Sequence, residues 1–218
     1  MKLVIWDIDG TLVDSHAVIM ASMDAGMAAA GLPPLPHAQV STIVGLSLPI
    51  AIATLLPGAS EAARDTVAEG YRTHYMTTRS AGESALFPGA LATLTRLAAR
   101  DDMLMAVATG KSRRGLNALL DEHDLARFFA TTECADGNPS KPAPGMILAC
   151  LRDTGIAADR AVMIGDTSFD MDMARNAGTQ ALAVAWGHHP AARLTDAGAR
   201  AVARDFPDLD RLIDEFLT

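Results

Sequence analysis

Short apolar runs alternate along this chain with longer stretches in which apolar residues recur every three or four positions. Such short runs are typical of parallel strands that are buried on both faces, and they cover residues 3–6, 103–108, 161–164 and 181–185, with a weaker candidate at 128–131. The periodic stretches predict helices over residues 90–100, 112–123, 144–154 and 168–177. Strands and helices that alternate in this way predict an α/β fold with right-handed crossovers.

The segment 15–86 interrupts this alternation, because its patterns predict helices only. Candidate caps and breaks, such as Ser15, Gly31 and Pro57-Gly58, bound three helices at about 15–31, 47–57 and 60–79. We therefore predict an all-helical cap domain over residues 15–86, inserted into a Rossmann-like parallel-sheet core formed by residues 1–14 and 87–218. The cap would cover the carboxyl ends of the strands, where open α/β sheets bind ligands.

The amino-acid composition and the net charge restrict the classes of partner and the location that this protein can have. Half of the 218 residues are apolar and the formal net charge is −8, which argues against nucleic acid as a partner. We find neither a transmembrane stretch nor a signal peptide, and the two cysteines, Cys134 and Cys150, are expected to be reduced thiols. The sequence therefore predicts a cytoplasmic protein with no membrane partner, and it gives no indication of the oligomeric state.

Two carboxylates follow the first apolar run directly, in Asp7-Ile8-Asp9-Gly10-Thr11. In an extended chain, residues i and i+2 point the same way, so Asp7 and Asp9 face one point while Ile8 faces the opposite side. Two like charges at the end of a buried strand are costly unless a cation or a proton is shared. Gly10 allows the sharp turn that brings the backbone close to a ligand. We predict a metal ion beside this acid pair.

Three further polar turns follow predicted strands or close a linker: Thr109-Gly110-Lys111-Ser112, Ser140-Lys141-Pro142 and Gly165-Asp166-Thr167-Ser168-Phe169-Asp170. The Thr109 hydroxyl and the N–H groups after it, at the start of a helix, can hold an anionic oxygen. Lys111 is a candidate substrate contact, although a solvated helix face would also explain it. Lys141 precedes a proline, which favours an extended backbone at Lys141 and so restricts the position of its ammonium group.

The fourth turn supplies more acids. Ser168 is predicted to cap the following helix, and Asp170 can share a face with Asp166 once the chain turns helical. A simple capped helix also explains Asp170, but it does not explain a buried Asp166. Oxygen ligands from Asp7, Asp166 and the main chain of Asp9 would suit Mg²⁺. The pair His188-His189 is interpreted as a surface loop.

These four turns, in this order, resemble the motifs of the haloacid dehalogenase superfamily, and the resemblance covers the whole chain. It is closest to the phosphatases with a small helical cap, and among these to phosphoglycolate phosphatases, through Val44-Gly45-Leu46-Ser47-Leu48, Phe87-Pro88-Gly89 and Ala185-Trp186-Gly187. The resemblance implies a Mg²⁺-dependent phosphomonoester hydrolase that acts on a small phosphorylated metabolite. The first candidate for that metabolite is 2-phosphoglycolate.

The resemblance also implies a role for each motif residue. Asp7 would be the nucleophile that forms an aspartyl-phosphate, and Asp9 would protonate the leaving alcohol and then activate water. The substrate phosphate would be bound by Thr11, Thr109, Gly110 and Lys141. The metal would be held by Asp7, Asp9, Asp166 and Asp170, with Asp170 bound directly or through water.

Single residues of the chain bear on several alternative functions. Asp9 is the second acid that similar dehalogenases lack, and segment 15–86 contains no lysine for the Schiff base of phosphonate-cleaving relatives. Similar sugar-phosphate mutases carry an arginine where this chain has Leu48; Arg72 and Arg79 are the candidate cations of the cap. Receiver domains place their phosphorylated aspartate after a later strand. A pyrophosphatase, a nucleotidase, a sugar phosphatase and a non-catalytic phospho-ligand-binding relative remain alternatives.

Overall fold

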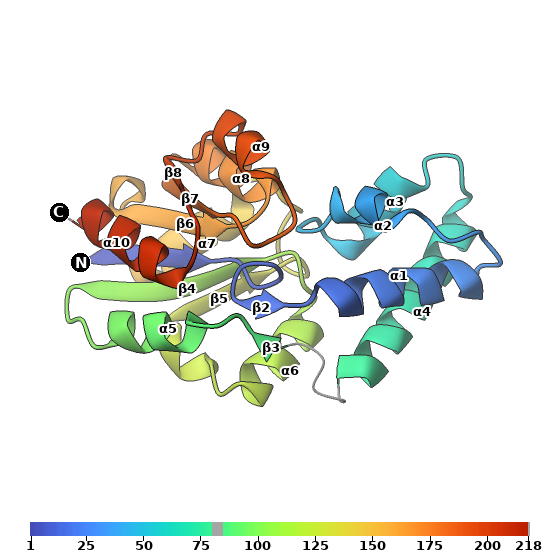
Figure 1. Cartoon of the computed structure of the whole chain (residues 1–218), viewed down its shortest axis with the longest axis horizontal. Helices are drawn as coiled ribbons and strands as arrows, with labels where there is room; N and C mark the ends of the chain where they lie inside the picture. Colours follow the sequence, from blue (N-terminus) through green and yellow to red (C-terminus); the bar gives the residue numbers. More distant parts are fainter. Residues whose placement is uncertain (80–84, 218) are drawn as a thin grey trace.

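The chain folds into two lobes, an α/β lobe and a helical lobe (Figure 1). The computed structural model describes residues 1–79 and 85–217. The α/β lobe contains a six-stranded sheet in the order β5-β4-β1-β6-β7-β8, and every pairing in it is parallel. Its strands are β1 (Lys2–Trp6), β4 (Met103–Thr109), β5 (Thr131–Cys134), β6 (Ala161–Gly165), β7 (Gln180–Val184) and β8 (Ala201–Ala203). The predicted α/β fold with a parallel-sheet core is confirmed.

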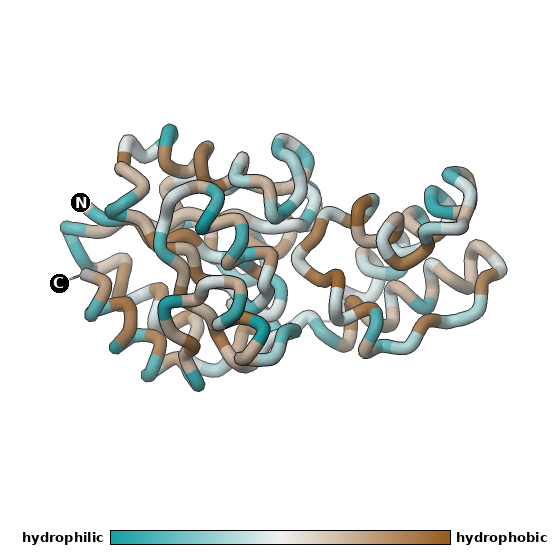
Figure 2. The backbone as a smooth tube through the Cα atoms, turned by 90° about the horizontal axis from the view of Figure 1, so that it is seen from above, coloured by the Kyte–Doolittle hydropathy of each residue, from teal (hydrophilic) through white to brown (hydrophobic). Residues whose placement is uncertain are grey.

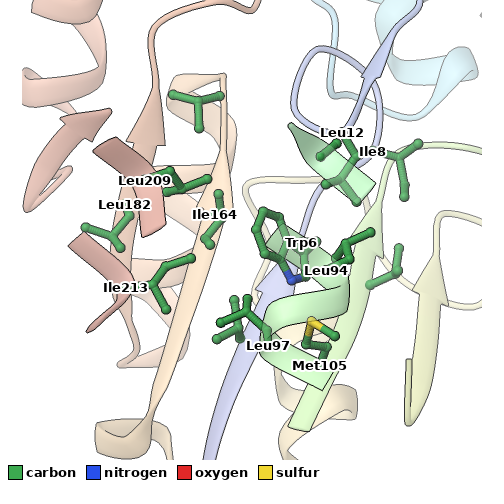
Figure 3. Close-up of a cluster of buried hydrophobic side chains, with 14 of the residues drawn as sticks. Trp6, Ile8, Leu12, Leu94, Leu97, Met105, Ile164, Leu182, Leu209 and Ile213 are labelled. Atoms are coloured by element: carbon green, nitrogen blue, oxygen red, sulfur yellow. The ribbon is translucent and has the colours of Figure 1, made fainter. Parts of the chain in front are cut away.

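Helices cover both faces of this sheet, which explains why its central strands are apolar on both sides. One face packs against α5 (Ala90–Ala98), α6 (Arg113–Glu122) and α10 (Phe206–Leu217), and the other against α7 (Gly145–Thr154), α8 (Ser168–Ala177) and α9 (Ala191–Asp196). Alternate residues of β1 enter the two clusters: Val4 and Trp6 face α5 and α10, as Figure 3 shows for Trp6, while Leu3 and Ile5 face α7 and α8. This alternation continues past the strand, where Ile8 joins the cluster of Trp6.

The helical lobe, which we call the helical block, consists of α1 (His16–Ala29), α2 (His37–Ser41), α3 (Leu48–Leu55) and α4 (Glu61–Arg79). It has a hydrophobic cluster of its own, which includes Met20, Met23 and Met27 of α1. The block joins the α/β lobe through a short antiparallel pair, β2 (Val13–Asp14) with β3 (Ala85–Leu86). Figure 2 shows the same two lobes from above, with apolar segments inside each.

The structure corrects some predicted elements. The strand expected at 128–131 is wrong: a 3₁₀ turn, η1 (Ala126–Phe128), ends at the first of these residues, and β5 begins only at Thr131. The prediction failed because β5 is a polar edge strand, whereas the apolar Phe128 and Phe129 pack on the core from outside the sheet. A second 3₁₀ turn, η2 (Ala158–Arg160), precedes β6. The elements α2, β2, β3 and β8 are too short to give a periodic signal.

Two compositional predictions can be compared with the structure. In the part of the chain that is described, no helix is both long and apolar enough to cross a bilayer. Cys134 and Cys150 are buried free thiols, as predicted. The cytoplasmic location stays a prediction.

Candidate active site

The candidate site lies at the carboxyl ends of three neighbouring strands, β4, β1 and β6. Thr109 is the last residue of β4, and Asp7 and Asp166 come directly after β1 and β6. The N–H of Asp7 donates to the carbonyl oxygen of Ile164 at 2.9 Å, so the pairing of β1 with β6 extends into the site. Side chains that are more than 150 positions apart in the sequence meet here because parallel strands present their carboxyl ends at one edge.

Three buried carboxylates meet at this edge. Asp7, Asp166 and Asp170 each offer an oxygen, and these oxygens lie within 4.8 Å of one another. The buried ammonium group of Lys141 lies 3.0 Å from Asp7 Oδ1 and 2.6 Å from Asp170 Oδ1. One ammonium cannot neutralise three carboxylates, so the cluster favours a further cation.

The hydrogen-bond pattern of Asp7 fits such a cation. Both of its carboxylate oxygens are buried, and neither accepts a hydrogen bond from the described residues, although Oδ1 is ion-paired with Lys141. A buried carboxylate without donors is costly unless a ligand completes it. Hard oxygen donors with an unmet demand for positive charge are the set that a divalent cation of the Mg²⁺ type prefers. The cluster could therefore hold a divalent metal.

Burial and mutual repulsion shift the acidity of this cluster. Burial raises the pKa of Asp7 to about 7, and Asp170 adds to this, while the ammonium of Lys141 opposes it. Burial, together with the charges of Asp170 and Asp7, raises the pKa of Asp166 well above its usual range. A bound cation would reverse both shifts by favouring the charged carboxylates.

Asp170 has a second task at the start of α8. Its Oδ2 accepts hydrogen bonds from the N–H of Thr167 at 3.0 Å and from the Thr167 hydroxyl at 2.6 Å. Thr167 is therefore the cap residue of α8, and the prediction that Ser168 would cap this helix is wrong. Since Oδ1 meets Lys141, Asp170 belongs both to the helix cap and to the acid cluster.

Asp166 is held by the loop that follows β1 and by the loop that follows β7. Its oxygens accept hydrogen bonds from the Thr11 hydroxyl at 3.0 Å and from the N–H of His188 at 2.8 Å. Gly10 has φ +79°, and a Cβ atom there would lie 2.3 Å from Asp166 Oδ2, so the turn requires glycine. The hydroxyl and the N–H of Thr11 both bond within the protein. Thr11 therefore supports Asp166, and the phosphate contact predicted for Thr11 stays a prediction.

Asp9 lies apart from the three clustered acids and pairs with Lys111. The ammonium of Lys111 donates to both Asp9 oxygens at 2.8 Å and to the hydroxyl of Tyr75, on α4, at 2.6 Å. Burial raises the pKa of Asp9, but the charge and the hydrogen bonds of Lys111, together with smaller contributions from Ser15 and His188, hold it below its usual value. The Asp9 carboxylate is therefore engaged by Lys111, and the metal contact predicted for the main chain of Asp9 stays a prediction.

Lys111 itself is buried, with 6% of its side chain exposed. Its desolvation opposes the charged form, yet Asp9 and Tyr75 raise the pKa of Lys111 above the ordinary lysine value. The alternative prediction of a solvated helix face is therefore wrong for this residue.

The helical block closes over the turn at Thr109-Gly110. A Cβ atom on Gly110 would lie 2.5 Å from the carbonyl oxygen of Gly45, and the N–H of Ser47 donates to the Ser140 hydroxyl at 2.9 Å. A cavity of about 480 Å³ lies between the two lobes and includes Asp7 and Asp9 in its wall. Leu48 and Arg72 line it as well, whereas the side chain of Arg79 lies outside the described residues.

Replacing Gly110 by Ala is expected to open this closure, because the new methyl group would collide with the backbone of Gly45. Catalytic efficiency, kcat/KM, should fall about 10-fold or more, since lid positioning contributes to orientation. Steady-state kinetics and the melting temperature measure the two effects separately. Gly137→Ala is the matched control, because a Cβ atom there meets nothing within 4 Å. Unchanged kinetics in Gly110→Ala would contradict the closure.

Sequence reasoning missed two residues of this region. Tyr75 reaches Lys111 only through the tertiary packing of α4, and no motif marks it. His189 is buried, and its Nδ1 accepts a hydrogen bond from the N–H of Ser168 at 2.9 Å. The predicted surface loop is therefore wrong for His189, whose ring completes the start of α8.

Comparison with known proteins finds consistent matches. The family model described as haloacid dehalogenase-like hydrolase matches residues 4–184. Among curated proteins, a phosphoglycolate phosphatase of Agrobacterium fabrum is 34% identical, and the match covers 85% of this chain and 81% of that protein. A phosphoglycolate phosphatase of Rhodospirillum rubrum is also 34% identical, over 95% of this chain and 89% of its own.

Solved structures share the fold. A hydrolase from Pseudomonas syringae superposes with a TM-score of 0.88 at 24% identity, and the match covers 99% of each chain. A haloacid dehalogenase-like family protein from Streptococcus pneumoniae superposes with a TM-score of 0.83 at 25% identity, covering 99% of this chain and 98% of that one.

Proposed function

This chain belongs to the haloacid dehalogenase-like hydrolase family and is a phosphatase for a small phosphorylated substrate, and from this premise we propose that it hydrolyses 2-phosphoglycolate through an aspartyl-phosphate on Asp7, with Mg²⁺ as its cofactor. The observation that carries the proposal is the buried Asp7 carboxylate, which has Lys141 and two further acids beside it and no hydrogen-bond donor of its own. A divalent cation on that carboxylate would balance the excess negative charge of this arrangement.

In the first half of the reaction, a carboxylate oxygen of Asp7 attacks phosphorus while the bond from phosphorus to the ester oxygen breaks. Asp9, once it has taken up a proton from solvent, gives that proton to the departing alcohol. Lys141 lowers the repulsion between the carboxylate and the phosphate dianion, and the Thr109 hydroxyl with the N–H of Gly110 binds phosphoryl oxygens. Phosphoryl transfer depends mainly on such positioning and charge neutralisation.

In the second half, Asp9 takes a proton from water, whose oxygen attacks phosphorus and releases phosphate and the free Asp7 carboxylate. The ion pair with Lys111 favours the carboxylate form of Asp9, which is the form that accepts this proton. The closed helical block would keep bulk water away from the intermediate.

The proposed Mg²⁺ would be held by Asp7, Asp166 and the main chain of Asp9, with Asp170 directly or through water. When bound, it would neutralise charge on the transferring phosphoryl group. Asp170 also holds the ammonium of Lys141, so loss of its carboxylate would disturb both cations.

Phosphate release from a panel of phosphomonoesters tests the proposal. The panel should include 2-phosphoglycolate, a sugar phosphate, a nucleoside monophosphate and pyrophosphate, each with Mg²⁺ and with a chelator. We expect Mg²⁺-dependent release with 2-phosphoglycolate as the preferred compound. Preference for another member would change the substrate, and release that persists in chelator would overturn the metal assignment.

Metal binding is expected to strengthen as the pH rises from about 6 to about 8. Burial raises the pKa of Asp7 to about 7 and raises that of Asp166 well above its usual range, so the metal-free site holds protons that the metal must displace. Titration calorimetry in two buffers with different ionisation enthalpies counts the protons released on Mg²⁺ binding. Asp172→Asn, on the same helix as Asp170 but outside the cluster, should release the same number. Heats that do not depend on the buffer would contradict the expectation.

A further inference from the structure

The buried ammonium of Lys111 is a feature that the proposed mechanism leaves without a task in substrate binding. It lies in the cavity wall at the junction of three segments: the loop after β1 through Asp9, the turn after β4 through its own backbone, and α4 through Tyr75. A desolvated ammonium is costly and is retained where its charge is used.

The cavity presents its positive charge unevenly. Arg72, Lys111 and Arg114 are the cationic residues described along its wall, and Lys111 alone is buried. Arg72 is half exposed, with 51% of its side chain accessible, and it lies 3.7 Å from Glu69. The only buried cation described along the wall is therefore the single ammonium of Lys111, which matches a monoanion better than a second phosphate dianion.

We propose that Lys111, held by Tyr75, determines specificity by binding a carboxylate on the carbon next to the phosphate ester oxygen, and that this carboxylate takes the place of Asp9 on the ammonium. The inference rests on the proposed function, because it uses the position of Asp9 beside the ester oxygen. The substrate class is thus the phosphate esters of 2-hydroxy acids, of which 2-phosphoglycolate is the smallest.

The hydrogen bonds of Asp9 and Lys111 explain why we place the substrate carboxylate on the carbon next to the ester oxygen. In the proposed reaction Asp9 hydrogen-bonds the ester oxygen, and Lys111 hydrogen-bonds Asp9 at 2.8 Å. A group that replaces Asp9 on Lys111 must therefore lie close to the ester oxygen. A carboxylate one carbon away satisfies this, whereas a carboxylate at the far end of a long chain does not.

Tyr75 keeps Lys111 in place during the exchange. Its hydroxyl accepts from the ammonium at 2.6 Å, and the ammonium also lies 4.7 Å from the centre of its ring. Tyr71 stacks on Tyr75, with ring centres 5.9 Å apart and planes 11° apart. These contacts are independent of Asp9, so Lys111 retains its contacts with the hydroxyl and the ring of Tyr75 when Asp9 leaves it.

Apolar side chains surround the remaining space and allow a larger acid. The cavity wall includes Ile19 and Met23 from α1, and Ile43 from the loop between α2 and α3. A 2-hydroxy acid with a short apolar substituent would bury that substituent here.

The ratio of kcat/KM for 2-phosphoglycolate to kcat/KM for 2-hydroxyethyl phosphate tests the inference, because the two esters differ by a carboxylate in place of an alcohol. We expect the wild type to prefer 2-phosphoglycolate and Lys111→Met to lower the ratio about 30-fold. Lys111→Arg should restore part of the ratio. Tyr75→Phe keeps the ring and should lower the ratio about 5-fold.

Tyr71→Phe is the matched control, because the Tyr71 hydroxyl does not bond to Lys111 among the described residues; its ratio should stay within about twofold of the wild type. A purely structural role of Lys111 would lower both efficiencies equally and leave the ratio unchanged, which would overturn the inference. Wild-type hydrolysis that requires Asp7 but shows no preference would also overturn it while leaving the proposed phosphatase mechanism intact. Absence of Asp7-dependent hydrolysis of every ester would instead reject the proposed function and the inference with it.

Discussion

Asp7→Asn is expected to lower kcat more than about 10,000-fold while the protein stays folded. The amide keeps the shape of the carboxylate but removes the nucleophilic charge, so no aspartyl-phosphate can form. The same change removes the charge of one of three clustered acids, whose pKa burial and the charge of Asp170 raise. Stability at neutral pH should therefore be equal or higher than in the wild type. Phosphate release and thermal unfolding measure these two effects.

A matched control distinguishes the loss of the nucleophile from the loss of a negative charge. Asp172→Asn removes a carboxylate from the same lobe, but Asp172 pairs with Arg175 on α8 and lies outside the acid cluster. It should keep kcat within about twofold of the wild type. Acid quenching during turnover of a labelled substrate should trap phosphoprotein in the wild type and none in Asp7→Asn. Substantial turnover by Asp7→Asn would exclude this residue as nucleophile.

Lys141→Met is expected to lower kcat about 1,000-fold. The ammonium lies within 3.0 Å of Asp7 and of Asp170, and it is fully buried with them. Because Lys141 opposes the upward shift of the pKa of Asp7, its loss should raise that pKa above about 7 and leave more of the nucleophile protonated at neutral pH. The pH-rate profile should therefore move to higher pH, and Mg²⁺ should partly restore the thermal stability of the variant.

Lys2→Met is the control for this substitution. Lys2 is another of the three lysines of the chain, and it donates to the carbonyl oxygen of Phe216, far from the cluster. Its loss should change kcat less than about twofold. A pH-rate profile that is the same in the wild type and in Lys141→Met would contradict the electrostatic role of Lys141.

Much of the α/β core could be predicted from local pattern. The runs around Val4, Val107, Val162 and Leu182 are apolar on both faces because helices cover the sheet on both sides, and this burial is visible in the sequence as an unbroken apolar run. The edge strand β5 lacks such an apolar run, because an edge strand tolerates polar residues such as Thr131 and Glu133. The five-residue helix α2 could not be predicted, because a periodic pattern of apolar residues needs more than one turn of helix.

The acids of the site were also readable from the sequence, for a physical reason. Asp7 and Asp166 each directly follow an apolar strand, and buried charge at such a place has few structural explanations. The strand order then determines which of these side chains lie close together. Because β1 lies between β4 and β6, Thr109, Asp7 and Asp166 are neighbours.

The sequence by itself determined the sheet, the inserted helices and the residue types that carry the chemistry, because hydrophobic period and charge placement are local properties of the chain. Only the tertiary structure decided that Lys111 is buried between Asp9 and Tyr75, that Thr11 supports Asp166, and that Gly110 lies against the helical block. These contacts join segments that are far apart in sequence. Their partners depend on how one lobe closes on the other, which no local pattern of the chain records.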